Sequence, residues 1–404
     1  MQENFLSRTR KFTPQTFFLS ILHLAAGTNN NGYLSALHNT WQKSGLKLNT
    51  TPTKSSLSEY REKVSSAFFK DIFAEDLNRA DPYRKKFRGL YVYAIDGDHL
   101  YLPLSKNILD HGFRGTRHSK TKETHYPKMY TAQVLDVVNG LIKDFSYSPQ
   151  VAEIDLAREM ASRLEKNSVT IYDRLHASYH TVLTHMNSES FYLIRVKDQN
   201  PKNQLEIQKF CRSAKRSQWI SLVAARPERI IFQPITVRLV KIKNPRTKKN
   251  IVFMTNLSED RFSYKEIASL YQRRWEIESS FKDLTDTLKM CDWRTIKLNG
   301  ILQEIYALFW LVNQVRLQCA QAVKTTSRWL EGQYKKSNLK LCVELVMLHL
   351  DLIIGRKNRK FQNILDFWIC RSSEKRKHLS RSYPRITRHF GKKYINASTV
   401  ERRP

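Results

Sequence analysis

The feature that most constrains the fold is a series of short strand-like segments in the middle of the chain, with a helical segment among them. Four segments are rich in the aromatic and β-branched residues that favour strands, namely 89–103, 130–138, 141–149 and 168–173. The dipeptide Asn139-Gly140, between the second and third, strongly favours a tight hairpin turn. An amphipathic pattern over about residues 151–166 predicts a helix before the fourth strand. This order of strands and helix predicts an α/β or α+β sheet domain.

The remaining chain is expected to flank and extend this sheet domain. A helix near 178–188 and a strand over 190–197 complete its first part, and Asp96-Gly97 is expected to form a turn between two short strands. Helical spacing dominates before residue 85 and after residue 263. We therefore expect five segments: a helical N-terminal region (1–85), the first part of the sheet core (86–197), a β-rich insertion (198–249), the second part of the core with a long helix (250–330), and a helical, basic C-terminal region (331–404).

The chain has a large excess of positive charge. Its 404 residues include 69 Lys and Arg against 37 Asp and Glu, which gives a formal net charge of +32. A charge of this size indicates a polyanionic partner, with nucleic acid as the first candidate and an anionic membrane surface as the second. The plain alternative is a basic soluble protein that binds neither.

The sequence predicts a cytoplasmic protein that does not enter the membrane. The most apolar run, 341–355, is too short for a membrane span and contains charged residues. The N-terminus has no long apolar stretch that would indicate a signal peptide. The five Cys include no C-x-x-C pair, which is typical of free thiols in a reducing compartment and not of a zinc site.

Three acidic residues stand where a sheet edge and a helix would present them. Asp96 ends the strand-like run YVYAID, Asp173 ends VTIYD, and Glu278 lies in a helix that we expect to run from 263 to 290. Carboxylates that converge from separate elements are the ligands that a pair of Mg²⁺ ions requires for phosphoryl transfer. Each acid alone also has a structural interpretation, because such residues are common as turn formers and caps. Asp98 is an alternative candidate for the same ligand position, and we favour Asp96.

The expected helix places several polar residues near one another. At about 100° per residue, Tyr271, Glu278 and Lys282 fall within roughly 40° of one another, with Arg274 about 60° to one side. A surface helix stabilised by ion pairs four residues apart, such as Arg274 with Glu278, explains the charges. It gives no role to Tyr271.

The same helix resembles the signature of the DDE transposases of the insertion-sequence-four family. That signature is Tyr, two residues, Arg, three residues, Glu, six residues and Lys, and its first three positions are Tyr271, Arg274 and Glu278. The segment 94-AIDGDHLYLP-103 is similar to the one that contains the family's first catalytic Asp, and Asp173-Arg174 is similar to the second. The likeness extends in order over most of the chain.

Two positions depart from the family pattern. The final Lys would fall at position 285, which is Thr285 here, so Lys282 and Lys289 are the candidate cations on that helix face. The Gly that is usual after Asp-Arg is Leu175. Neither departure removes a metal ligand.

The resemblance implies an RNase H-like mixed-sheet core in which Asp96, Asp173 and Glu278 are the catalytic residues and the ligands of two Mg²⁺ ions, for which Mn²⁺ can substitute. It implies cut-and-paste transposition: DNA is hydrolysed at the ends of an insertion sequence, and the freed 3′-hydroxyl attacks target DNA. The partners would be both of these DNAs, held by a nucleoid-associated homodimer whose N-terminal region binds DNA. The expected DNA contacts are Tyr271, Arg274, Lys282, Lys289, Arg174, Trp219, Arg381 and Arg385.

Some residues, and the function itself, keep alternatives. Trp219 in the insertion could stack on an extruded base, although such a Trp is more often part of a core or an interface. The pair His176 and His180 lacks the Glu of a zinc motif, which favours a helical surface or capping role. Glu276 favours surface pairing. The alternative functions are a catalytically silent DNA-binding relative and an RNase H-like endonuclease without strand transfer.

Overall fold

The computed structural model groups the chain into two compact units, which we describe separately. The sheet unit consists of residues 77–100 and 129–283, and the helical unit of residues 1–76, 101–128 and 284–404. The residues that the structure describes are 12–26, 32–43, 51–115, 117–119, 122–123, 126–150, 153–196, 205–223, 233–243, 249–326, 337–350 and 359–372. The expected division into five segments stays a prediction.

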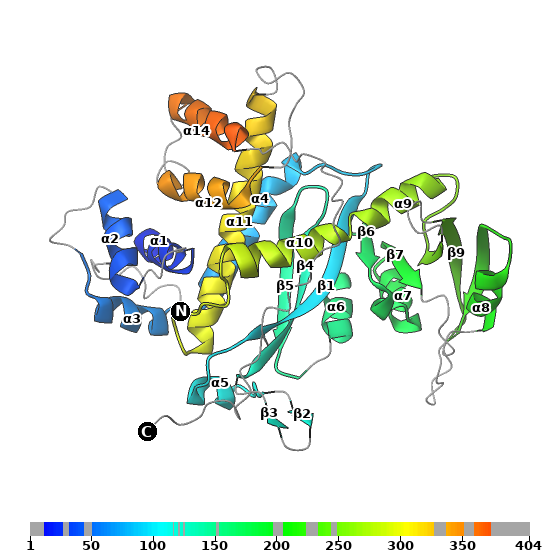
Figure 1. Ribbon diagram of the computed structural model, residues 1–404, viewed down its shortest axis with the longest axis horizontal. Helices are drawn as coiled ribbons and strands as arrows, with labels where there is room; N and C mark the ends of the chain where they lie inside the picture. Colours follow the sequence, from blue (N-terminus) through cyan, green and yellow to red (C-terminus); the bar gives the residue numbers. More distant parts are fainter. Residues whose placement is uncertain are drawn as a thin grey trace, which may run out of the picture. The chain divides into compact units, whose positions relative to one another are not determined.

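The main sheet is mixed, as the sequence predicts. Its order is β5-β4-β1-β6-β7-β10-β9-β8 (Figure 1). The central strands β1, β6 and β7 are parallel, whereas β4 with β5, and β10 with β7 and β9, are antiparallel, as is β8 with β9. The bounds are β1 Tyr91–Tyr101, β4 Lys128–Asp136, β5 Leu141–Ser148, β6 Ser168–Tyr172, β7 Phe191–Val196, β8 Ser217–Leu222, β9 Ile235–Lys243 and β10 Asn250–Thr255.

Helices cover both faces of this sheet. Tyr91, Tyr93 and Ile95 of β1 face a core shared with apolar residues of α6 (Glu153–Ala161), α7 (Tyr179–Asn187) and α8 (Leu205–Arg212). Neighbouring residues in a strand point to opposite faces. On the opposite face, the ring of Phe253 in β10 packs on Tyr271 of α9 (Tyr264–Gln272), with the ring centroids 4.6 Å apart. The sheet therefore has α6, α7 and α8 on one face and α9 on the other.

The segment 198–249, expected as a β-rich insertion, adds strands to the main sheet. It contains α8, β8 and β9, and both strands extend the main sheet beyond β10. The β-rich character is as expected, but the strands share the hydrophobic core of the sheet unit, through residues such as Ile220 and Val237.

The strand β1 corrects one sequence prediction. We expected Asp96-Gly97 to form a turn between two short strands, and β1 instead continues through both residues to Tyr101. An Asp-Gly pair favours a turn only locally, and pairing with the flanking strands overrides that preference. The hairpin prediction holds, because β4 and β5 are joined through residues 137–140 with Gly140 at φ 72°.

The helix expected over 263–290 is not continuous, which is a second correction. It consists of α9, then α10 (Trp275–Lys282), then a π-helix over Asp283–Thr287. At the junction of α9 and α10, the N–H groups of Arg273 and Arg274 donate to the carbonyls three residues earlier. Such tightened turns rotate the residues that follow them, so the angles calculated for one regular helix do not apply.

The end of this helical segment also differs from expectation. Lys289 lies beyond the π-helix with φ 55°, and the N–H of Met290 donates to the carbonyl of Leu284. This is the geometry of a helix C-terminus closed by a left-handed residue. The prediction that Lys282 and Lys289 share one helix face is therefore wrong.

The helical unit is built from the N-terminal and C-terminal helices, as the sequence predicts. Their bounds are α1 Pro14–Ala25, α2 Tyr33–Lys43, α3 Lys54–Lys63, α4 Ala67–Ala80, α5 Lys106–Asp110, α11 Leu298–Thr326, α12 Leu339–Leu348 and α14 Arg359–Arg371, with short strands β2 Arg117–Ser119 and β3 Lys122–Glu123. Aromatic rings join α1 to α11, for example Phe18 with Trp310. A buried ion pair of 2.8 Å between Arg61 and Glu304 joins α3 to α11. No helix in the described part of the chain is long and apolar enough to cross a membrane.

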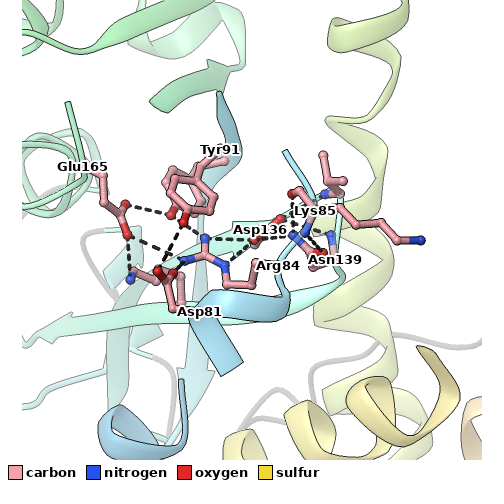
Figure 2. Close-up of polar contacts among 10 residues, drawn as sticks. Asp81, Arg84, Lys85, Tyr91, Asp136, Asn139 and Glu165 are labelled. Atoms are coloured by element: carbon pink, nitrogen blue, oxygen red, sulfur yellow. Dashed lines mark hydrogen bonds and ion pairs between the residues drawn. The ribbon is translucent and has the colours of Figure 1, made fainter. Parts of the chain in front are cut away.

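A buried arginine fixes one end of the sheet. Arg84 follows the 3₁₀ turn Asp81–Tyr83, and its side chain is 2% exposed. It pairs with Asp136 of β4 at 2.9 Å and donates to the Tyr93 hydroxyl of β1 at 2.5 Å (Figure 2). Because Asp136 is 1% exposed, this pair balances two charges that water does not reach.

We expect Arg84→Met to destabilise the protein by about 3–5 kcal/mol, because it leaves Asp136 as an uncompensated buried charge. The matched control is Lys166→Met, which removes a pair with Glu189 whose side chains are 72% and 69% exposed; it should cost less than about 1 kcal/mol. Urea unfolding measures both. Equal effects of the two substitutions would contradict the structure.

A buried histidine makes the fold sensitive to acid. His185 of α7 lies within hydrogen-bond distance of the Tyr172 hydroxyl (2.8 Å) and the Ser190 hydroxyl (2.7 Å). Burial lowers the pKa of His185 from 6.5 to about 3. The unfolded chain binds the proton more tightly, so the stabilising effect of neutral His185 is present above about pH 6.5 and is lost as the pH falls toward 3.

We expect the free energy of unfolding to decrease between pH 7 and pH 4, with His185 contributing up to roughly 3 kcal/mol of the change. His185→Gln, which keeps polar atoms but does not titrate, should show a shallower decrease. Denaturant unfolding at a series of pH values measures this. Parallel curves for the two proteins would exclude His185 as the cause.

Candidate active site

Two neighbouring parallel strands bring Asp96, in the middle of β1, close to Asp173, which directly follows β6. β1 and β6 are neighbours, and Ala94 lies opposite Ile171. Continued by two residues, this register places Asp96 opposite Asp173, about one strand spacing of ~4.8 Å away. Asp173 follows β6 and caps the 3₁₀ turn Arg174–His176, whose first N–H donates to its carboxylate at 2.6 Å.

Arg274 connects Glu278 to these strands. Its Nη2 donates to Oε1 of Glu278 at 2.6 Å, and its Nη1 lies 3.6 Å from Oδ2 of Asp96. The negative charge of Asp173 also acts on Arg274. The Arg274 side chain is 10% exposed, so a largely buried guanidinium lies among the three predicted acids. The ion pair expected between Arg274 and Glu278 is present.

The site has a surplus of negative charge at Asp96. Burial, and then the negative charge of Glu153, raise the pKa of Asp96 from 3.8 to about 6, although the positive charge of Arg274 opposes the shift. A raised pKa means that the ionised carboxylate raises the free energy of the folded protein. A cation bound beside Asp96 would offset this unfavourable free energy.

The rival ligand Asp98 has different surroundings. Its side chain is 37% exposed against 21% for Asp96. Its carboxylate accepts from the N–H of His99 at 2.8 Å, and its carbonyl accepts from Thr131. Arg274 forms ion pairs with Asp96 and Glu278. The geometry therefore favours Asp96.

Tyr271 lies close to the same group. Its ring packs on Phe253, and burial raises the pKa of its hydroxyl, with Arg274 and Asp173 among the charges that act on it. The break between α9 and α10 keeps Tyr271 and Arg274 near each other, because Arg274 N–H donates to the carbonyl of Tyr271. The helix thus gives the tyrosine a place beside the acids.

The other predicted DNA contacts are spread out. Arg174 is exposed directly after Asp173, and Lys282 is exposed at the end of α10. Trp219 is 51% exposed on β8, the edge strand four places from β6 in the sheet. Lys289 belongs to the helical unit. Arg381 and Arg385 lie outside the described residues.

The histidine pair behaves differently from the sequence prediction. His176 is 1% exposed in the 3₁₀ turn after Asp173, whereas His180 is exposed on α7. The expected surface role is wrong for His176, because the turn directs this side chain into the protein. Its Nε2 lies 3.6 Å from Oε1 of Glu153, the first residue of α6. Sequence reasoning missed Glu153, for which the only signal was an acid near an expected helix start.

The donor chemistry of the site fits a hard divalent cation. Carboxylate oxygens are the ligands that Mg²⁺ and Mn²⁺ accept, and the raised pKa of Asp96 indicates unbalanced negative charge. In the part of the chain that the structure describes, no three His, Cys, Asp or Glu side chains are already assembled as a metal-binding group. The assignment of Asp96, Asp173 and Glu278 as metal ligands therefore stays a prediction.

We expect Asp96→Asn to stabilise the metal-free protein at pH 8. Because the pKa of Asp96 is raised from 3.8 to about 6, holding this carboxylate ionised costs the folded protein free energy, and the cost is fully present above about pH 6; its removal should therefore increase the free energy of unfolding at pH 8 by up to about 3 kcal/mol. The control Asp98→Asn should change it by less than about 0.5 kcal/mol. Unfolding in the presence of a chelator measures both, and a destabilised Asp96→Asn protein would contradict the assigned environment.

Comparison with known proteins places the chain in a family. No curated protein sequence matches it. Among solved structures, it is similar to the cryo-EM structure of a piggyBac transposase synaptic complex with hairpin DNA, with 13% identity, a TM-score of 0.45, and coverage of 95% of this chain and 86% of that one. Residues 88–314 match the family model described as the transposase DDE domain. Because this match takes in more than half of the chain, including Asp96, Asp173 and Glu278, the protein belongs to the transposase DDE domain family.

Proposed function

We propose that this protein is a cut-and-paste DNA transposase of the insertion-sequence-four type. It would cleave DNA at the ends of an insertion sequence and join the freed 3′-hydroxyl to target DNA. The observation that supports this most strongly is the gathering of Asp96, Asp173 and Glu278 around Arg274, within the segment that matches the DDE domain.

The three acids are the proposed catalytic residues and metal ligands. DDE domains use divalent metal ions, and we assign two Mg²⁺ ions to this site, with Mn²⁺ as a substitute. Bound there, the ions would activate the attacking oxygen and stabilise the leaving oxygen. Asp96 would contribute from within β1, Asp173 from the position directly after β6, and Glu278 from α10.

Arg274 has two successive roles in this proposal. In the free protein its guanidinium balances Asp96 and Glu278. With cations bound to these acids, the same guanidinium would be available to bind a phosphate beside the scissile bond, for which a planar, two-pronged donor is well suited. Tyr271 would contact the same DNA strand, and Lys282, exposed on α10, is the better candidate for the missing lysine of the signature because Lys289 lies beyond the helix.

The charge of the chain supports DNA as the partner. A net charge of +32 favours the polyanionic backbone of both the element ends and the target. We propose that Arg174 and the C-terminal Arg381 and Arg385 contribute to this backbone contact, and that Trp219 contacts DNA away from the acids. A homodimer would hold two element ends together.

A second candidate function is a DNA-binding relative without catalysis. The observation that favours it is the Arg274–Glu278 ion pair, which engages one proposed ligand in the free protein. An endonuclease without strand transfer would use the same acids. A labelled element-end duplex incubated with Mg²⁺ would remain without nicks if the protein only binds DNA. If the protein is an endonuclease without strand transfer, the duplex would be nicked, but an added target duplex would give no joined product.

We expect Asp96→Asn, Asp173→Asn and Glu278→Gln each to reduce DNA cleavage by about 10³-fold or more, because metal-assisted charge stabilisation contributes several kcal/mol to such a reaction. DNA affinity, measured by fluorescence anisotropy, should change little. Glu276→Gln, on the exposed side of α10, is the matched control and should retain cleavage. Full activity in any of the three variants removes that residue from the catalytic set.

A further inference from the structure

Glu153 reaches from the start of α6 to Gly97 in the middle of β1, 56 positions earlier in the sequence. The N–H of Gly97 donates to Oε1 of Glu153 at 3.2 Å and to Oδ1 of Asp96 at 3.0 Å. One backbone N–H thus holds two carboxylates side by side. Two like charges in a partly buried place repel each other unless a cation balances them.

Gly97 makes this approach possible. A Cβ atom added at Gly97 would lie 2.0 Å from Cγ and 2.4 Å from Cδ of Glu153. Any other residue would push the Glu153 side chain away from Asp96. The absence of a side chain at position 97 is therefore a requirement of the Glu153 contact, and not of a turn, because β1 is continuous here.

His176 is a further neighbour of Glu153. It is 1% exposed, and neither of its ring nitrogens has a hydrogen-bond partner among the described residues. Its Nε2 lies 3.6 Å from Oε1 of Glu153. Buried polar atoms without hydrogen-bond partners are uncommon in folded proteins, so those of His176 require an explanation. A histidine that holds a carboxylate ligand in place is such an explanation.

Glu153 interacts electrostatically with both Asp96 and Asp173. Its charge acts on Asp96, and the charge of Asp173 acts on Glu153. Glu153 is therefore the acid that lies electrostatically between the two aspartates, whereas Glu278 is held by Arg274. These three carboxylates come from β1, from the residue that follows β6, and from α6.

We propose that Glu153 is a fourth carboxylate ligand of the divalent-metal site, beside Asp96, and that His176 is a positioning residue that holds Glu153 in its ligating position. This inference rests on the proposed function, since it deepens the same site. It assigns metal binding to a residue of α6 that the transposase signature does not include.

Direct binding of Mn²⁺ to the full-length protein, measured by electron paramagnetic resonance without DNA, tests the inference. Glu153→Gln should weaken Mn²⁺ binding by about tenfold or more, as loss of a ligand or of its support typically does. Glu159→Gln, on the same helix with its side chain 59% exposed, is the matched control and should bind as the unchanged protein does. Thermal unfolding in chelator confirms that each variant is folded.

His176→Gln tests the positioning role separately. It should weaken Mn²⁺ binding in the otherwise unchanged protein and have no further effect in a Glu153→Gln background, because it acts only through Glu153. Equal effects of His176→Gln in both backgrounds would show a merely structural role and overturn that part of the proposal.

The outcomes separate this inference from the proposed function. If Asp96→Asn abolishes Mn²⁺ binding while Glu153→Gln leaves it unchanged, the function stands and the role of Glu153 is overturned. If the unchanged protein neither binds Mn²⁺ nor cleaves DNA, both fail together. Weakened binding in both variants, with Glu159→Gln normal, supports both.

Discussion

Partly buried negative charge, in the middle of β1 and directly after β6, is the constraint around which the sheet unit is organised. The parallel pairing of these strands brings two aspartates to one edge, and Glu153 adds a third carboxylate through the N–H of Gly97. Burial, and then the negative charge of Glu153, raise the pKa of Asp96 to about 6. In the free protein the guanidinium of Arg274 provides part of the compensating positive charge.

The rest of the fold keeps these charges together. The eight-stranded sheet is packed on one side by α6, which delivers Glu153, and on the other by α9 and α10, which deliver Tyr271, Arg274 and Glu278. The buried Arg84–Asp136 pair fixes the strand that borders β1. Residues from both faces of the sheet therefore meet beyond the carboxyl end of the central strand β6, and the carboxyl ends of parallel strands are a usual place for a ligand to bind.

Much of this arrangement could be predicted from the sequence, because it follows from strand and helix periodicity. The alternation of apolar residues identified the strands, and two acids that directly follow strands were expected at a sheet edge. The break after Gln272 was not predictable in the same way. Hydrogen bonds to carbonyls three residues earlier change the helix rotation without changing the pattern of apolar and charged residues.

The contacts that the sequence did not reveal are those between distant segments. Asp96-Gly97 has the local chemistry of a turn, and only strand pairing shows that it is extended. Glu153 lies far along the chain from Gly97, and His176 carries no sign of its burial, so neither could be placed beside Asp96 without the fold.

The central claim is that the acids around Arg274 form a cation site. Anomalous X-ray diffraction from crystals of the protein grown with Mn²⁺ tests it most directly, because the signal locates the metal itself. We expect Mn²⁺ peaks between Asp96, Asp173 and Glu278, with the Arg274 guanidinium turned away from Glu278. Crystals saturated with Mn²⁺ that show no peak there, and an unchanged Arg274–Glu278 pair, would contradict the claim.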